Sequence, residues 1–303
     1  MLDIPEQLAA LRRLAIKDQA RIVGAASAAE LSAWRSYFPY LYGYARGGSR
    51  TLLWEIEDDA VCLYILRPRN GMLRLDLYLA PFPFSARALR HAQDRANDFN
   101  RSSSCEIVWV EEAQRPAIES LGFRTQLRES EYIYDARQVR SMDGPSFARL
   151  RRNVGKAQRI SDVSLRDYQA QDEVACLALL RNWRDALRDG KGVDVKSHTY
   201  MSRCVRNAFA FDGDLLRGTV ALVDERVVGF CFGGRMGQSL GNLFVCVSNH
   251  NMPLLGYLLR QDFVARSEGI ARFNDASDAG REGVALVKRA FNPVAMLPLY
   301  RAR

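Results

Sequence analysis

The 303-residue sequence has no long apolar run, and it contains only five lysines and three histidines. No apolar stretch approaches the roughly 20 residues that are needed to span a bilayer. Residues 1–19 also lack the apolar core and the cleavage site of a secretory signal. We therefore expect a cytoplasmic protein without a transmembrane segment, for which peripheral contact with a membrane stays open.

The cysteines and histidines form no metal or redox motif. No CxxC occurs, and no two cysteines pair with a histidine at the spacing of a zinc site. Six cysteines (Cys62, Cys105, Cys176, Cys204, Cys231 and Cys246) and three histidines (His91, His198 and His250) are scattered along the chain. We expect buried free thiols in a reducing compartment, no metal site and no histidine-based triad.

The cations are almost all arginine. Of the 43 basic residues 38 are arginine, and the net charge is +8. Guanidinium forks suit phosphate, which favours a polyanionic partner. The codon preference of a GC-rich genome explains the ratio equally well, so the position of the charges carries more information than their number.

The apolar pattern repeats one order of elements in the two halves of the chain. In the first half it predicts helices near 6–20 and 28–36, strands 51–58, 60–66 and 72–80, helix 85–100, strand 106–110, helix 113–120 and strand 131–135. In the second half it predicts helix 171–188, strands 215–224, 226–235 and 242–248, helix 253–268, strand 270–276, helix 280–290 and strand 294–302. This is the element order of the GNAT acyltransferase fold, and AIESLGF (117–123) resembles the end of that fold. We predict an α/β protein of the α+β type, with two tandem GNAT-like domains (1–138 and 139–303) whose mixed central sheets are flanked by helices.

A basic helix is predicted where the two halves meet, in SMDGPSFARLRRNVGKAQRI (141–160). Gly144 and Pro145 form a suitable helix start, with proline at the first helical position. On a helical wheel Leu150, Val154 and Ala157 fall on one side. The opposite side gathers four cations, which are Arg149, Arg152, Lys156 and Arg159. Both a solvated helix face and a polyanion-binding face stay open.

Two segments carry a resemblance to a known family. EYIYDARQVRSMDGPSFARLRRNVGKAQR resembles a motif of the phosphatidylglycerol lysyltransferase C-terminal domain family, with matches at Tyr132, Tyr134, Asp135, Gly144, Arg151, Arg152 and Asn153. FNDASDAGREGVALVKRAFNP (273–293) resembles the C-terminal motif of that family, with matches at Asn274, Asp278, Gly280, Gly283, Lys288, Phe291 and Pro293. Arg151–Ala157 is also similar to a helix of the Fem aminoacyltransferases. Two features differ from the family, because residues 248–251 replace an acidic-basic pair and the large membrane region of the lipid-modifying members is absent.

The resemblance implies tandem GNAT folds and transfer of an amino acid from aminoacyl-tRNA, which serves as co-substrate without a further cofactor. The acceptor stays open among a small metabolite such as a natural-product intermediate, a lipid head group and a cell-wall precursor. The residues expected to bind tRNA are Arg149, Arg151, Arg152, Asn153, Lys156, Arg159 and Arg281. Lys288 is expected to contact the oxyanion or the terminal ribose phosphate, and Asp278 to hold the donor ammonium or the loop. Asn274 and Asp275 are further catalytic candidates.

Structural roles for the same residues stay open. On the wheel of 280–290, Val284, Val287 and Phe291 form the core stripe, and Lys288 lies with Arg281 at its border. Lys288 can therefore extend along a domain edge with its ammonium in water. Asp278 can cap the following helix.

Two other functions compete with aminoacyl transfer. An acyl-CoA-dependent GNAT N-acyltransferase needs a glycine-rich phosphate loop at the start of the helix after its central strand. The equivalent segments, PFPFSARAL (81–89) and SNHNMPLLGY (248–257), do not fit that loop, and Pro253 stands where it should be. This favours a donor other than acyl-CoA. A non-catalytic protein that binds tRNA or another anion stays open.

Overall fold

The computed structural model describes residues 2–45, 49–160, 162–191, 198–252 and 254–303, so Pro253 lies outside the described residues. The chain forms two compact units. The first unit is Met1–Ser130 together with Leu297–Arg303, and the second unit is Glu131–Met296. The domain division at 138/139 stays a prediction. No helix in the described ranges is long and apolar enough to cross a bilayer.

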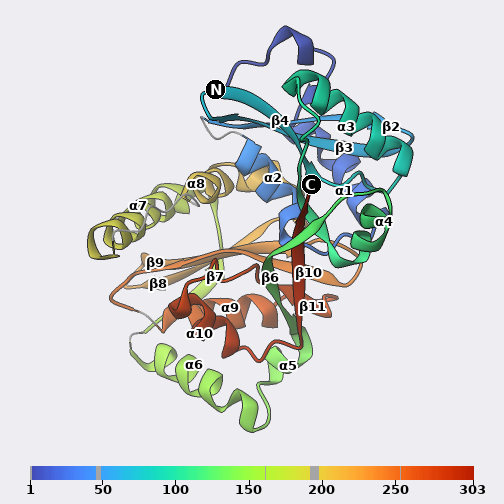
Figure 1. Cartoon of the computed structure of the whole chain (residues 1–303). Coiled ribbons are helices and arrows are strands. Elements are labelled where there is room, and N and C mark those ends of the chain that lie inside the picture. The colour runs from blue at the N-terminus through green and yellow to red at the C-terminus, as the bar shows by residue number, and fades with distance from the viewer. Residues whose placement is uncertain (1, 46–48, 161, 192–197, 253) are drawn as a thin grey trace. The chain divides into compact units, whose positions relative to one another are not determined.

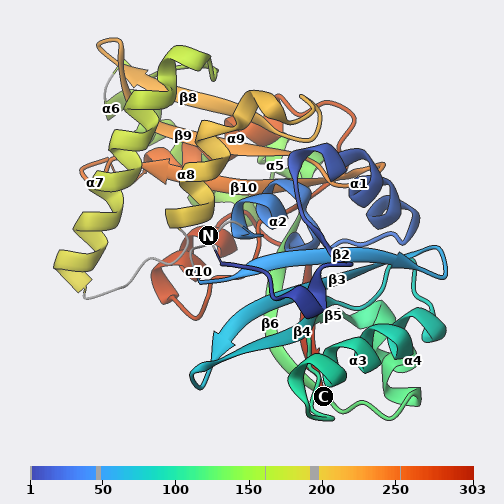
Figure 2. The same ribbon diagram turned by 90° about the horizontal axis from the view of Figure 1, so that it is seen from above.

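The first unit is a mostly antiparallel sheet with helices on its two sides (Figure 2). Its strands are β1 (Arg12–Arg13), β2 (Thr51–Glu57), β3 (Ala60–Arg69), β4 (Met72–Leu79), β5 (Ile107–Glu111), the first part of β6 (Thr125–Asp135) and the last part of β12 (Ala295–Ala302). Its helices are α1 (Gln19–Ala28), α2 (Phe38–Ala45), α3 (Ala86–Asn100) and α4 (Arg115–Ser120), with 3-10 turns at Glu6–Leu8, Ile16–Asp18, Trp34–Ser36 and Glu112–Gln114. The strand order begins β1-β2-β3-β4-β5-β12, and only β4 and β5 run parallel within it.

The second unit has the order β6-β11-β10-β9-β8-β7, in which only β10 and β11 run parallel. Its further strands are β7 (Ser164–Asp167), β8 (Arg217–Val223), β9 (Arg226–Arg235), β10 (Leu240–Ser248) and β11 (Arg272–Asn274). Its helices are α5 (Ala136–Ser141), α6 (Ala148–Ile160), α7 (Glu173–Lys191), α8 (His198–Arg206), α9 (Leu255–Ala265) and α10 (Glu282–Arg289), with 3-10 turns at Pro145–Phe147, Ala170–Asp172 and Ala208–Ala210. Figure 1 shows α7 and α8 on one side of β8–β10, and α9, α10 and α6 on the other.

The two units contain the same order of strands and helices, as the apolar pattern predicts. Three antiparallel strands are followed by a helix and a strand parallel to the third, as β2-β3-β4-α3-β5 and again as β8-β9-β10-α9-β11. A parallel pair needs a crossover, which α3 and α9 supply. Each unit also has its own cluster of buried apolar side chains, which α3 completes in the first unit and α9 in the second. The α/β fold with mixed strands flanked by helices is therefore confirmed.

The helices predicted near 6–20 and 28–36 are wrong. Arg12 and Arg13 extend the edge of the sheet as β1, pairing with Trp54 and Leu53 of β2. The buried carboxylate of Asp18 accepts hydrogen bonds from the backbone N–H of Ala15 and the indole of Trp54, so α1 begins only at Gln19. Pairing with β2 thus overrides the local helical pattern. The short elements α5, α8 and β7 are further differences from the predicted order.

A glycine lets α9 approach the sheet closely. A Cβ at Gly229 of β9 would lie 2.9 Å from Leu255 and 2.8 Å from Leu259 of α9, closer than carbon atoms pack. Their side chains therefore occupy the space that a larger residue would fill. This close packing fixes the position of α9 on the sheet. Arg260 is the only cation in that helix.

Candidate active site

The segment 273–293 forms β11, a loop and α10 in the second unit. β11 pairs with β6, with Phe273 opposite Tyr134 and Asn274 opposite Ile133. In the loop that follows, Ala276 (φ 55°) and Ala279 (φ 53°) adopt the left-handed conformation. Such conformations cost an alanine about 1 kcal/mol or more and persist only where the surroundings impose them. The loop is therefore held in shape by its contacts.

Lys288 supplies three of those contacts. Its ammonium donates hydrogen bonds to the backbone carbonyls of Asp275, Ala276 (3.1 Å) and Ser277 (2.9 Å). An ammonium has three N–H donors, so all three are used by the loop. The side chain is only 5% exposed, whereas the wheel predicts it at the border of the core. Burial lowers the pKa of Lys288, and the negative charge of Asp275 opposes that shift.

Asp275 is the centre of a buried charge cluster. Its carboxylate accepts a hydrogen bond from the hydroxyl of Tyr134 (2.9 Å). It also lies 3.3 Å from Arg260 Nε and 3.8 Å from Lys288 Nζ. Glu131 is a second buried carboxylate whose charge acts on Lys288. Two carboxylates thus face two cations, which offsets the cost of burying each charge.

Asn274 joins the loop to β6. Its side-chain amide donates to the carboxylate of Glu131 (2.7 Å), and its amide oxygen accepts from the backbone N–H of Ala276 (2.8 Å). The residue is fully buried. Both ends of its amide therefore serve the architecture of the loop.

Of the four predicted catalytic residues, Asp278 is half-buried, whereas the other three are buried. It accepts hydrogen bonds from the Tyr132 hydroxyl (2.7 Å) and the backbone N–H of Gly280 (2.8 Å). The bond from Tyr132 is the main cause that holds the pKa of Asp278 below its ordinary value. Burial, with the charge of Asp278, raises the pKa of Tyr132 to about 12. At neutral pH Asp278 is therefore ionised. It caps the turn at Gly280. The expectation that it caps the following helix is wrong, because the N-cap of α10 is Arg281 and makes no side-chain cap hydrogen bond.

The basic helix is α6, and its two faces are as predicted. Leu150, Val154 and Ala157 are buried in the core of the second unit, where α6 packs against α9. The predicted cationic face (Arg149, Arg152, Lys156 and Arg159) is exposed. Within the described part of the chain none of these four side chains makes an ion pair or a hydrogen bond. Four unpaired cations on one helix face repel one another, and a bound polyanion would relieve that repulsion.

The remaining predicted tRNA contacts have mixed surroundings. Arg151 is exposed but donates hydrogen bonds to the carbonyls of Met142 and Gly144 (2.8 Å), which fixes the turn before α6. Asn153 is half-buried on α6. Arg281 is exposed at the N-cap of α10, whereas Lys288 of the same helix is buried. The structure thus gathers Asn274, Asp275, Asp278 and Lys288 in one cluster and presents the cations of α6 as a second group.

Sequence reasoning missed Arg260 and Glu131. Arg260 is the only cation in the apolar helix α9, and that isolation is a signal for a buried ion pair. Glu131 directly precedes the Tyr132–Asp135 motif, but nothing in its local sequence marks it as the partner of Asn274. That contact joins residues 143 positions apart in the chain.

A family model, "Phosphatidylglycerol lysyltransferase, C-terminal", matches residues 29–246 of the chain. The chain belongs to this family. The predicted family is thereby confirmed. The first motif lies within the matched residues, whereas the motif at 273–293 lies outside them. No curated protein matches the sequence significantly.

Solved structures of low sequence identity share the fold of this family member. A conserved protein of unknown function from Bacteroides thetaiotaomicron has a TM-score of 0.78 at 17% identity, covering 96% of this chain and 98% of that chain. L-PGS from Bacillus licheniformis has a TM-score of 0.64 at 13% identity, with coverage of 94% and 91%. FemX has a TM-score of 0.61 at 9% identity, with coverage of 95% and 96%. A tandem GNAT protein from the clavulanic acid biosynthesis pathway also shares it, with a TM-score of 0.52 at 14% identity and coverage of 96% and 97%. These likenesses establish the GNAT-like fold.

In this member of the lysyltransferase C-terminal family the two motifs contact each other. Tyr132 and Tyr134 of the first motif donate hydrogen bonds to Asp278 and Asp275 of the loop region. Asp135 instead caps α5, since its carboxylate accepts from the backbone N–H of Gln138 (2.9 Å). The tyrosines and the loop aspartates therefore form one structural assembly.

Proposed function

We propose that this protein transfers an aminoacyl group from aminoacyl-tRNA to an amine or hydroxyl acceptor. The observation that carries the proposal is the exposed cationic face of α6, which is backed by a buried apolar side and has no ion-pair partner among the described residues. A rigid row of cations suits a nucleic-acid backbone. Membership of the lysyltransferase C-terminal family supports the same donor. The acceptor we propose is a small metabolite or a lipid head group, and the compartment is the cytoplasm.

The proposed reaction needs no covalent intermediate with the protein. The acceptor nitrogen or oxygen attacks the ester carbonyl carbon, and the bond from that carbon to the ribose oxygen breaks. The acceptor loses one proton, and the departing ribose oxygen gains one. Because the ester is already activated, positioning of donor and acceptor supplies a large share of the rate.

We assign Asp278 to the α-ammonium group of the donor. It is ionised and half-buried, and two hydrogen bonds leave part of its acceptor capacity unused,. Asn274 and Asp275 are buried, and their side chains already make hydrogen bonds to neighbouring groups of the protein. We therefore give them the role of positioning the loop. An oxyanion contact by Lys288 would require the loss of at least one of its three hydrogen bonds to the loop.

The experiment that tests this assignment compares a donor that has a free amine with an N-acetylated donor. The wild-type protein should use aminoacyl-tRNA better than N-acetyl-aminoacyl-tRNA, because acetylation removes the charge that Asp278 binds. In Asp278→Asn the KM for the free-amine donor should rise about tenfold, while the KM for the acetylated donor should stay unchanged. Initial transfer rates over a range of donor concentrations give both values.

Glu282→Gln is the matched control, since it removes an exposed carboxylate at the first position of α10. It should leave the preference between the two donors unchanged. Equal losses with both donors in Asp278→Asn would contradict a contact between Asp278 and the ammonium group, and would show a role in the loop alone.

A further inference from the structure

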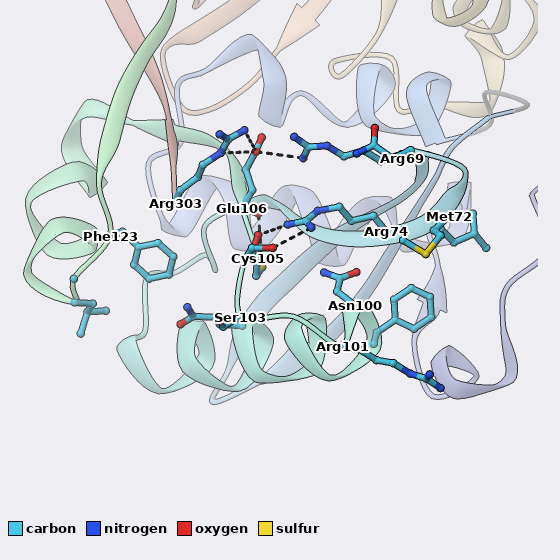
Figure 3. Close-up of a pocket in the computed structure, with 17 residues that line it drawn as sticks. Arg69, Met72, Arg74, Asn100, Arg101, Ser103, Cys105, Glu106, Phe123 and Arg303 are labelled. Carbon is cyan, nitrogen blue, oxygen red and sulfur yellow. Dashed lines mark hydrogen bonds and ion pairs between the residues drawn. The ribbon is translucent and has the colours of Figure 1, made fainter.

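A cavity of about 660 Å³ lies in the first unit, where β4 and β5 begin. Its walls are the end of β3 and the first residues of β4, the end of α3, residues 103–106 just before β5, residues 121–123 and Arg303 (Figure 3). A volume of this size accommodates a small organic molecule. None of the residues assigned above to transfer or to tRNA binding lines it.

Arginines dominate the charge of this cavity. Arg69 and Arg303 extend toward Glu106 from opposite sides, and Arg74 lies beside them, whereas Arg101 points away (Figure 3). Arg303 Nη2 lies 2.7 Å and Arg69 Nη1 3.7 Å from the Glu106 carboxylate. Glu106 is the only acidic side chain among the lining residues. Behind the wall, the buried carboxylate of Asp76 pairs with Arg74 (2.9 Å) and Arg67 (3.1 Å). The cluster therefore sets four arginine side chains (Arg67, Arg69, Arg74 and Arg303) against the side-chain carboxylates of Asp76 and Glu106, an excess of two positive charges.

The carboxylate does not use all of the guanidinium donors. Arg303 donates to Glu106 through Nε and Nη2, which leaves Nη1 without a hydrogen bond in the described part of the chain. Arg69 contacts Glu106 only as an ion pair, at a distance too long for a hydrogen bond,. Burial raises the pKa of Glu106, but the hydrogen bonds and positive charge of Arg303, with the charges of Arg67 and Arg69, outweigh that effect and lower it. The cluster is therefore fully charged and retains free donors.

The rest of the wall is apolar. Leu73, Phe99, Leu121 and Phe123 line the cavity, and Met72 is 73% exposed at its margin. Burial raises the pKa of the Cys105 thiol to about 12, so this sulfur is protonated at neutral pH and is not a nucleophile,. The cavity therefore has the features of a binding site: a cationic end, an apolar wall and no reactive group.

We propose that this cavity binds a phosphate monoester whose organic part is apolar. A phosphate dianion matches the excess of two positive charges, and its three terminal oxygens can accept from the free donors of Arg69 and Arg303 at the same time. The organic part then lies against Phe99 and Leu121. The phosphate can belong to a soluble ester or to the head group of a lipid, and the site is independent of the proposed aminoacyl transfer.

Phenyl phosphate is the probe for this site, and its affinity for the full-length protein is measured by titration calorimetry. Arg69→Gln and Arg303→Gln should each weaken phenyl phosphate binding about tenfold, because each removes a charge-assisted hydrogen bond. Inorganic phosphate should bind more weakly than phenyl phosphate, since it lacks the apolar group. Arg90→Gln, an exposed change on α3 outside the cavity, is the control and should have no effect.

A variant that should bind phenyl phosphate more tightly separates loss of the site from misfolding. Glu106→Gln removes the carboxylate that competes for Arg69 and Arg303. It should therefore strengthen phenyl phosphate binding, a result that misfolding cannot produce. Competition with phosphatidic acid vesicles, using phosphatidylcholine vesicles as the blank, then distinguishes the sources. Displacement of phenyl phosphate assigns a lipid phosphate, and its absence assigns a soluble ester. No binding of phenyl phosphate at millimolar concentration, or binding that is unchanged in both arginine variants, would overturn the proposal.

Discussion

Replacing Lys288 with methionine should lower the free energy of unfolding by about 3 kcal/mol, because it leaves a buried carboxylate and three loop carbonyls without their cation. Methionine is of similar length and apolar, so the loss reports on the charge and its hydrogen bonds more than on packing. Urea denaturation followed by circular dichroism measures the change.

Arg289→Met is the matched control for this prediction. Arg289 is the next residue of α10, but it is exposed and its ion pair with Glu282 lies at the surface. The control should change the free energy of unfolding by about 0.5 kcal/mol or less. A Lys288→Met protein as stable as the control would contradict the view that Lys288 holds the loop, and would favour a role in chemistry.

Removing two cations from the exposed face of α6 should weaken the binding of tRNA and reduce its dependence on salt. Each cation that neutralises a phosphate adds close to one unit to the slope of log K against log salt concentration. Arg152→Gln/Lys156→Gln should therefore flatten that slope by about 2. Filter binding of labelled tRNA over a series of salt concentrations gives the slope.

Arg21→Gln/Arg90→Gln is the control with the same loss of charge. Both residues are exposed in the first unit and lack ion-pair partners in the described part of the chain. This control should bind tRNA with the wild-type slope. Equal slopes for the two double variants would show that net charge, and not the α6 face, determines binding.

The sequence predicted the repeated order of strands and helices and the two faces of α6, because both depend on the spacing of apolar residues along the chain. Leu150, Val154 and Ala157 recur at helical spacing, and the core of the second unit buries all three. The start of the chain was predicted wrongly, since Arg12 and Arg13 pair with β2, about forty residues further along. Local periodicity contains no information about such a partner.

The candidate site could be predicted only in part, and for a similar reason. The motif at 273–293 identified Asp278 and Lys288, but the wheel of α10 could not show that three loop carbonyls surround the lysine ammonium. The hydrogen bond between Tyr132 and Asp278 joins residues 146 positions apart. Buried polar groups need partners, yet only the fold decides which distant groups supply them.

The most direct test of aminoacyl-tRNA-dependent transfer is the discharge of radiolabelled aminoacyl-tRNA. The protein is incubated with a mixed pool of labelled aminoacyl-tRNAs and a lysate or lipid extract, and the label that reaches an acceptor is counted. Aminoacyl transfer predicts label on an acceptor only when the protein is present, and its loss when the tRNA pool is treated with RNase beforehand. Transfer from acetyl-CoA that RNase does not affect, without any discharge of the tRNA pool, would contradict it.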